Sequence, residues 1–434
     1  MSDSALVVAS PWPRTGSTNL FAAQARYLAT RGFHTAMLLA PHLPIHRSRN
    51  AAFWRDTLAA VERDCRSHPD DVGPDLITAG LTDQRLRRWR SAGFYRWLAH
   101  GRDSQLAVMA RYARAATLPP ELMAFLDSHD LRLIIASHCF QMGTVETVLH
   151  HLARRGRPRA RVVLETQDVQ AELYAVGKIN NSFRGEPDAR EVLTRDELRL
   201  VAGADALTHV TAHDLDYFRA HAPGRHHLTL ATLAPTTEHR LLTLPEEPPL
   251  FDFLYVGNVN PGNEISLTWF LDEVAPRLAP DIRVAIVGPI ASRLRTIRPD
   301  LHARWWLWCL GDVDDIADVY RRSAAVILPT RFGTGISIKT IEALAADRPV
   351  IATSLALRGL PIEPGRGGVA VVDDAAGFAD AMEEMRRQRS TRAGSARALY
   401  GELFSNARYF ARWDAVLADL GISPPTPASA GTPG

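Results

Sequence analysis

Lysine is almost absent from this chain: of its 50 lysine and arginine residues, only Lys178 and Lys339 are lysines. Cysteine is also scarce, and the three that occur are scattered without a Cys-x-x-Cys pair, which argues against a disulfide framework or a zinc site. No apolar run approaches the ~18 residues that a transmembrane helix requires. A formal net charge of +2 provides no global field for nucleic acid, so nucleic-acid binding is not expected.

The pattern of apolar residues predicts an α/β protein. A length of 434 residues, with 46% hydrophobic and 23% charged residues, fits a soluble globular chain of two or three domains. Short apolar runs alternate with helical periodicity in two series, which predicts two doubly wound, Rossmann-like domains facing a cleft. Strands are expected at residues 5–10, 34–40, 131–137, 161–165, 204–211, 251–256, 283–287, 305–310, 325–328 and 350–352.

The segment 324–354 carries the most information, because a short strand runs there into a glycine-bearing loop and then a helix. Glycine lets the chain approach a ligand closely, and the free N–H groups and dipole of a helix N-terminus attract negative charge. Lys339 and Glu342 share one helix face, so a cation could meet a phosphate and a carboxylate could accept from two sugar hydroxyls. The same spacing is equally typical of an ordinary surface ion pair. The candidate contacts are Gly333, Thr334, Gly335, Ile336, Lys339 and Glu342.

Five segments of the second half are specific through their order and spacing: FLYVGNVNPGNEISLTWFLDEVAPRL, VAIVG, LGDVDDIADVYRRSAAVILP, GTGISIKTIEALAADRPVIATSLALRGL and GGVAVVDDAAGFADAM. Together they resemble the nucleotide-binding domain of the family 4 glycosyltransferases, which have the GT-B fold. The first half resembles the acceptor domain of that family more loosely, through PRTGSTN and ELRLVAGADALTHVTAHDLDYF. The resemblance implies a retaining transfer of a sugar from a nucleotide diphosphate sugar to a hydroxyl acceptor.

The resemblance also implies a domain organisation. Composition alone marks the proline-rich stretch 241–250 as a linker and 422–434 as a disordered tail. Around them we expect an N-terminal acceptor-binding domain at 1–240 with a helical insertion at about 45–126, a C-terminal nucleotide-sugar-binding domain at 251–404, and a helix at 405–421 that returns to the N-terminal domain.

Donor contacts of the family can be transferred residue by residue. Glu342 matches the glutamate that bonds the ribose hydroxyls, and Gly335 matches the glycine of the loop. The remaining matches are Asp312 and Val313 beside the nucleotide base, Gly16 near the donor phosphates, and Gly257 with Asn258 after the first strand of the domain.

Two departures from the family pattern concern charge. Thr334 occupies the position of a frequent family glutamate, and the segment VGNVNPGN lacks the arginine and lysine that many members carry. The chain resembles instead a subset with a GxxxKxxE motif. We interpret Lys339, together with Arg331, as the source of positive charge at the leaving diphosphate.

Asp168 and His138, each after an expected strand, are the catalytic candidates on the acceptor side, beside Lys339 on the donor side. Gln167 occupies a position where family members often have histidine, and an amide cannot exchange a proton. Asp168 could still orient a sugar hydroxyl, and His138 is a second polar group at a strand end. The alternatives are a helix N-cap for Asp168 and a structural histidine for His138. Retaining enzymes of this fold are drawn with attack assisted by the departing phosphate, so a dedicated base is not required.

No metal and no other cofactor is expected. The run Asp312-Val313-Asp314-Asp315 mimics a metal-binding motif, but it precedes a helix whose dipole acidic residues complement. The five histidines between His209 and His227 match no zinc template, and we expect them on a charged helix and at its exit.

Segment 82–102 combines tryptophans and arginines on an expected helix. This pattern suits peripheral contact with an anionic membrane, and it equally suits a helix whose tryptophans pack on the domain, which is the interpretation we favour. The first apolar run is short and lacks a basic leader, so we expect a cytoplasmic protein, with membrane association as the alternative.

The sequence therefore predicts a cytoplasmic, metal-independent hexosyltransferase whose acceptor is a glycan, a lipid-linked sugar or a small molecule. Two alternatives stay open. A sugar-nucleotide epimerase could use the same fold, but no matching set of carboxylates is found. The second alternative is a non-catalytic binding subunit of the GT-B fold. Thr334 and Gln167 give it some weight, because they replace side chains that the family often uses.

Overall fold

The structure is a computed structural model, and it describes most of the chain. Segment 82–102, Thr334 and the residues from 426 onward lie outside the described residues. The described residues are 2–10, 16–40, 42, 59–66, 73–78, 104–114, 118–175, 190–243, 245, 247–302, 307–313, 315–333, 335–388 and 394–425.

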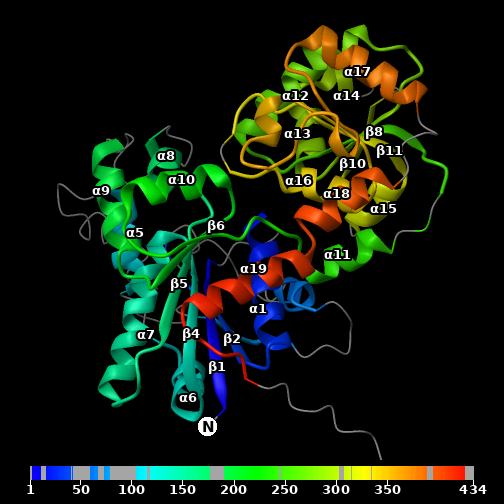
Figure 1. Cartoon of the computed structure of the whole chain (residues 1–434). Coiled ribbons are helices and arrows are strands. Elements are labelled where there is room, and N and C mark those ends of the chain that lie inside the picture. The colour runs from blue at the N-terminus through cyan, green and yellow to red at the C-terminus, as the bar shows by residue number, and fades with distance from the viewer. Residues whose placement is uncertain are drawn as a thin grey trace, which may run out of the picture. The chain divides into compact units, whose positions relative to one another are not determined.

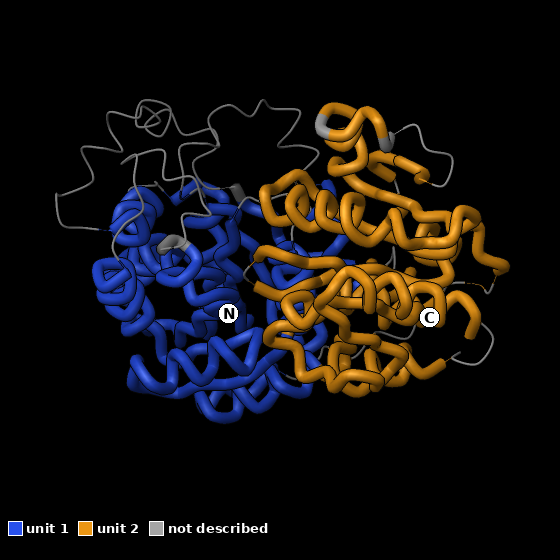
Figure 2. The backbone as a smooth tube through the Cα atoms, turned by 90° about the horizontal axis from the view of Figure 1, so that it is seen from above, with its two compact units in different colours: residues 1–230, 234–236, 409–434 blue, residues 231–233, 237–408 orange. Residues whose placement is uncertain are grey.

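The chain divides into two compact units (Figure 2). The first comprises Met1–Leu230, Ala234–Thr236 and Tyr409–Gly434, and the second comprises Ala231–Leu233 and Thr237–Arg408. Each unit contains one parallel sheet with helices packed against its two faces (Figure 1). These are the two Rossmann-like α/β domains that the alternating pattern predicts.

The first unit contains a seven-stranded sheet in the order β3-β2-β1-β4-β5-β6-β7. The strands that the sequence predicts here are its interior ones, whose apolar runs are buried on both faces of the sheet. The two edge strands, β3 and β7, were not predicted, because they are short and contain polar residues. The strands are β1 Asp3–Ala9, β2 His34–Leu39, β3 Asp75–Thr78, β4 Asp130–Ser137, β5 Arg161–Glu165, β6 Ala206–His209 and β7 His226–Leu228.

Helix α19 (Asn406–Asp419) lies alongside α1 (Gly16–Thr30) in the first unit (Figure 1). Asp414 of α19 accepts hydrogen bonds from the Tyr27 hydroxyl at 2.9 Å and from Arg31 Nε at 2.7 Å, and Trp413 is fully buried. Further helices of this unit are α5 Gln105–Arg114, α6 Pro120–Ser128, α7 Met142–Arg154, α8 Gln170–Ala175, α9 Arg190–Val201 and α10 Ala212–His221, while the first three residues of α19 belong to the second unit.

The second unit contains a six-stranded sheet in the order β10-β9-β8-β11-β12-β13. Its strands are β8 Phe251–Val256, β9 Val284–Val287, β10 Leu307–Gly311, β11 Ser323–Leu328, β12 Val350–Ala352 and β13 Val369–Val371. Among its helices are α12 Pro261–Trp269, α13 Pro289–Ile297, α14 Pro299–His302, α15 Ile316–Arg321, α16 Ile338–Ala345, α17 Ala375–Arg387 and α18 Ser395–Leu403, while α11 Pro235–Leu242 spans the boundary between the units.

The strand order of each sheet reverses at one point, between β1 and β4 in the first unit and between β8 and β11 in the second. In open α/β sheets, ligands bind outside the carboxyl ends of the strands at such a switch point. The loops that follow β8 and β11 therefore form the expected ligand site of the second unit. Over the described part of the chain, no helix has the length and apolar character needed to cross a membrane.

Candidate functional site

Lys339 is the centre of the polar contacts at the switch point of the second unit. It lies in the first turn of α16, and its Nζ donates to Asn263 Oδ1 at 3.0 Å, in the first turn of α12. The ammonium also lies 5.2 Å from the ring centroid of Tyr255 in β8, within the range of a cation–π contact. The side chain keeps a partly exposed surface, so a ligand could reach it.

The loop after β8 fixes the orientation of Asn263. Asn260 caps α12 by accepting from the Asn263 amide at 2.8 Å, and Pro261 occupies the first helical position. Asn263 Nδ2 donates to the carbonyl of Asn258 at 2.8 Å, which leaves Oδ1 facing Lys339. The predicted donor contact Asn258 thus enters the site through its backbone carbonyl, whereas its side-chain oxygen accepts from the Val259 amide at 2.8 Å.

Gly257 has a packing reason to be glycine. A Cβ atom built there would lie 2.8 Å from Ile290 Cγ2 and 2.9 Å from Tyr255 Cε1, both closer than real contacts allow. Gly257 is buried, so its contribution is to let the end of β8 approach α13.

Glu342 lies one turn after Lys339 on α16 and is also partly exposed. Its carboxylate accepts from the hydroxyl of Tyr320, in α15, at 2.8 Å. Burial raises the pKa of Glu342 to about 7, while the Tyr320 hydrogen bond and the charge of Lys339 oppose that shift. Burial lowers the pKa of Lys339 to about 8, while the charge of Glu342 opposes it. Both groups therefore titrate close to neutral pH.

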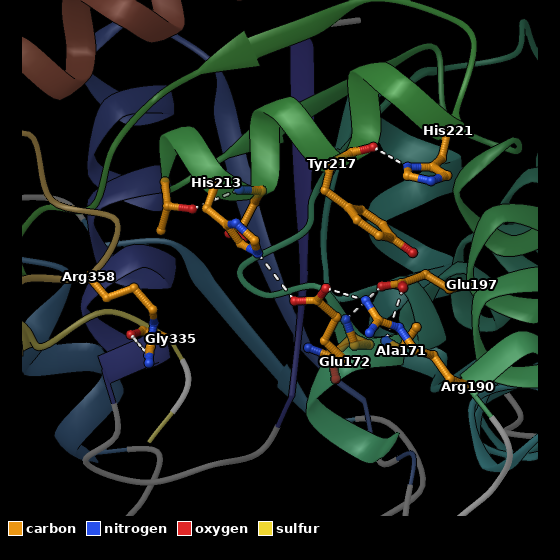
Figure 3. A network of polar contacts seen from close by, with 12 residues as sticks. Ala171, Glu172, Arg190, Glu197, His213, Tyr217, His221, Gly335 and Arg358 are labelled. Carbon is orange, nitrogen blue, oxygen red and sulfur yellow. Dashed lines mark hydrogen bonds and ion pairs between the residues drawn. The ribbon is translucent and has the colours of Figure 1, made fainter. Parts of the chain in front are cut away.

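The glycine loop between β11 and α16 is held by Arg358, which follows β12. Arg358 Nη1 donates to the carbonyl of Gly333, and its Nη2 donates to the carbonyl of Gly335 at 2.6 Å (Figure 3). Gly335 has a φ of 74°, a left-handed conformation that favours glycine. Ile336 follows it, partly exposed, before the helix begins at Ile338.

Arg331 contacts Trp269 and Asp373. Its guanidinium lies 4.8 Å from the Trp269 ring centroid, and Nη1 donates to the backbone carbonyl of Asp373 at 2.8 Å. Its own backbone amide donates to Ser266 Oγ at 3.0 Å, which ties the loop to α12. The cation beside Asn263 in this arrangement is therefore Lys339, and Arg331 braces the loop.

Asp312 and Val313 follow β10, with Asp312 exposed and Val313 partly exposed. Asp314 lies outside the described residues, and Asp315 caps α15 by accepting from the Ala317 amide at 3.0 Å. That contact agrees with the helix-cap interpretation of the acidic run. Over the residues that the structure describes, histidine, cysteine and acidic side chains nowhere gather in threes in an arrangement suited to a metal ion.

His138 follows β4 and Gln167 lies two residues after β5 in the first unit, and both have unusual backbone conformations. Their φ angles are 69° and 60°, in the left-handed region that residues with a Cβ rarely occupy. His138 is buried and stacks on Phe140 at 5.1 Å, and burial lowers its pKa to about 3. A neutral imidazole with so low a pKa has little tendency to take up a proton near neutral pH.

Asp168 precedes α8, and Gly16 begins α1. Asp168 is partly exposed before α8, but the first amides of that helix, from Gln170 and Ala171, donate to the buried carboxylate of Glu197 at 2.8 and 3.0 Å (Figure 3). Those two amides therefore have another acceptor than Asp168. Gly16 is the exposed first residue of α1, and the loop 11–15 before it lies outside the described residues.

The histidines between His209 and His227 occupy separate elements rather than one helix and its exit. His209 lies on β6, His226 and His227 lie on β7, and His213 lies on α10. His209 Nε2 and His226 Nδ1 are 3.1 Å apart, so the pair shares a hydrogen bond across neighbouring strands.

Sequence reasoning missed Asn263, Arg358 and Glu165. Glu165 is a fully buried carboxylate that accepts from Gln24 Nε2 at 2.8 Å, Gln167 Nε2 at 3.2 Å and the Tyr409 hydroxyl at 3.1 Å, and burial raises its pKa to about 7. A charged residue at the end of an apolar strand was the available signal for Glu165. Asn263 and Arg358 could have been sought in the loops after strands that neighbour β11 in the sheet.

A protein-family model matches part of the chain. Residues 251–388 match the sequence model of a family described as Glycosyl transferases group 1. The second unit thus carries a group 1 glycosyl transferase domain. No curated protein matches the chain.

Solved structures resemble the whole chain. Sucrose-phosphate synthase from Thermosynechococcus elongatus has a TM-score of 0.61 at 15% identity, covering 97% of this chain and 99% of that one. Anabaena HepE in complex with UDP has a TM-score of 0.58 at 12% identity, covering 96% and 100%. The lipopolysaccharide outer core galactosyltransferase WaaB has a TM-score of 0.55 at 11% identity, covering 96% and 99%. The chain has the GT-B fold.

Replacement of the two central side chains in the nucleotide-free protein should separate a ligand site from a structural ion pair. The ammonium of Lys339 is charged at pH 7 in both the folded and unfolded states, and its lowered pKa means that burial of this charge opposes folding below about pH 8. Lys339→Met should therefore leave the free energy of unfolding unchanged or raised. Glu342→Leu should be the less stable of the two variants: removal of its carboxylate also relieves a burial cost, because its pKa is raised, but the buried Tyr320 hydroxyl loses its acceptor at a cost of about 1–3 kcal/mol.

Urea unfolding at pH 7 measures both changes, with Arg386→Ala as a control in which an exposed pair with Asp281 is removed. A loss of more than about 2 kcal/mol in Lys339→Met would identify the ammonium as a structural element instead.

Proposed function

We propose that this protein is a retaining glycosyltransferase that moves a hexose from a nucleotide diphosphate sugar to a sugar hydroxyl. One observation carries the proposal: the ammonium of Lys339 and the carboxylate of Glu342 lie partly exposed on the first turns of α16, at the switch point of a group 1 glycosyl transferase domain. A site that desolvates a cation at a helix N-terminus is suited to a diphosphate.

Different residues hold the charged diphosphate and the polar ribose of the donor. The diphosphate meets the ammonium of Lys339 and the amides at the start of α16, and Glu342 accepts from the ribose hydroxyls one turn later. The loop with Asp312 and Val313 lies against the base. HepE has been solved with UDP and with UDP-glucose, which makes a uridine nucleotide the first candidate donor.

The chemical step requires charge stabilisation at the leaving group more than a protein base. The bond between the anomeric carbon and the diphosphate oxygen breaks, and its electron pair leaves with the diphosphate, where Lys339 neutralises the developing charge. The acceptor oxygen bonds to the anomeric carbon from the same face, and its proton passes to the departing phosphate oxygen. Asp168 orients the acceptor hydroxyl. His138 contributes hydrogen bonding rather than proton uptake, because burial lowers its pKa to about 3.

A nucleotide panel tests donor binding. One of UDP, GDP and ADP should raise the melting temperature, since a ligand at 100 times its Kd stabilises by about 2.7 kcal/mol. Lys339→Ala should weaken that affinity by about 30-fold, because a charge-assisted hydrogen bond of about 2 kcal/mol is lost. Arg386→Ala, which removes an exposed ion pair, should leave the affinity unchanged.

The matching nucleotide sugar should then be hydrolysed slowly without an acceptor, and Glu342→Ala should abolish that hydrolysis. Binding without any hydrolysis or transfer would identify a non-catalytic binding protein, and an epimerised donor would identify an epimerase. A chain that none of the three diphosphates stabilises would contradict the proposal altogether.

The affinity for the nucleotide sugar should pass through a maximum between about pH 7 and 8, the values to which burial moves the pKa of Glu342 and Lys339. Below the maximum Glu342 is protonated and accepts poorly from ribose, and above it Lys339 is neutral and no longer attracts the diphosphate. A nucleotide sugar is the right probe, because its phosphates carry no terminal ionisation near pH 6.

Calorimetric titration from pH 5.5 to 9.5 measures this profile. Glu342→Gln should flatten the acidic limb, and Lys339→Arg should flatten the alkaline limb because arginine stays charged throughout. A wild-type affinity that is constant across the range would show that neither group meets the ligand.

A further inference from the structure

Three backbone carbonyls of the loop between β11 and α16 accept hydrogen bonds from one neighbouring segment of the chain. Thr353 Oγ1 donates to the carbonyl of Thr330 at 2.7 Å, and Arg358 donates to the carbonyl of Gly333. Arg358 also donates to the carbonyl of Gly335 (Figure 3). Thr353 and Arg358 both belong to the segment that follows β12, the neighbour of β11 in the sheet. Three carbonyls of one loop therefore turn towards this segment.

The direction of a carbonyl determines the direction of the amide in the same peptide unit. Because a trans peptide is planar, its C=O and N–H bonds point in opposite directions. The carbonyl of Gly335 points at Arg358, so the amide of Ile336 points away from it. The left-handed φ of 74° at Gly335 allows this turn immediately before α16 begins.

The same arrangement changes the electrostatics that an anion would meet. A carbonyl oxygen carries partial negative charge and repels a phosphate, whereas an amide N–H attracts it. A guanidinium can engage two carbonyls at once, because it presents several N–H donors in a rigid planar fork. An ammonium has the same charge but lacks this planar geometry.

We propose that Arg358 is a positioning residue for diphosphate binding: it turns the carbonyls of Gly333 and Gly335 away from the donor, so that the amide of Ile336 and the start of α16 face the phosphates. This inference rests on the proposed function, and it assigns to Arg358 an action on the loop rather than a contact with the donor. Arg331, which sequence reasoning selected, instead holds the same loop against Trp269 and Asp373.

The test measures the Kd of the full-length protein for UDP, GDP and ADP by calorimetry, and compares Arg358→Ala with Arg358→Lys. Both variants should raise the Kd of the diphosphate that binds the wild type by about tenfold, because the two carbonyls are no longer held and a lysine cannot replace the fork. Millimolar methylguanidinium should restore much of the affinity of Arg358→Ala and none of that of Lys339→Ala.

Arg386→Ala serves as the matched control, because it removes a half-buried arginine of the same unit that pairs with the exposed Asp281. Wild-type affinity in Arg358→Lys would overturn the inference, since charge alone would then suffice. Wild-type affinity in Arg358→Ala, or an absence of rescue by methylguanidinium, would overturn it as well. A wild-type protein that binds none of the three diphosphates would instead defeat the proposed function, and the inference with it.

Discussion

The contact of the Lys339 ammonium with Asn263 and the Tyr255 ring is the interaction on which the second unit's site depends. It joins the first turns of α12 and α16, and so brings together the loops that follow β8 and β11. Burial of an ammonium opposes folding, and under the proposed function the diphosphate of the donor offsets that cost.

Sheet topology makes this contact possible. The reversal of strand order places β8 beside β11, so two loops far apart in the sequence emerge side by side at one edge. Arg358, in the segment after β12, then donates to the carbonyls of Gly333 and Gly335 in the glycine loop. In the first unit, the left-handed residues His138 and Gln167 follow the neighbouring strands β4 and β5, and such backbone strain tends to concentrate at functional sites.

Much of the fold could be predicted because interior parallel strands are continuous apolar runs, as β4 and β5 are, whereas the short edge strands β3 and β7 carry no such signal. The glycine loop, Lys339 and Glu342 could be predicted because their spacing is local. Asn263 lies 76 residues from Lys339, and Arg358 acts through a neighbouring strand, so neither partner is visible without the sheet order. Glu165 was missed for the same reason, since its donors Gln24 and Tyr409 come from opposite ends of the chain.

A crystal structure of the protein with bound UDP, or with another diphosphate if that one binds, tests the central claim most directly. The account predicts a diphosphate oxygen within hydrogen-bond distance of Lys339 Nζ, with the ribose hydroxyls on the carboxylate of Glu342. A nucleotide bound elsewhere, with Lys339 still donating to Asn263 and no phosphate at the start of α16, would contradict it.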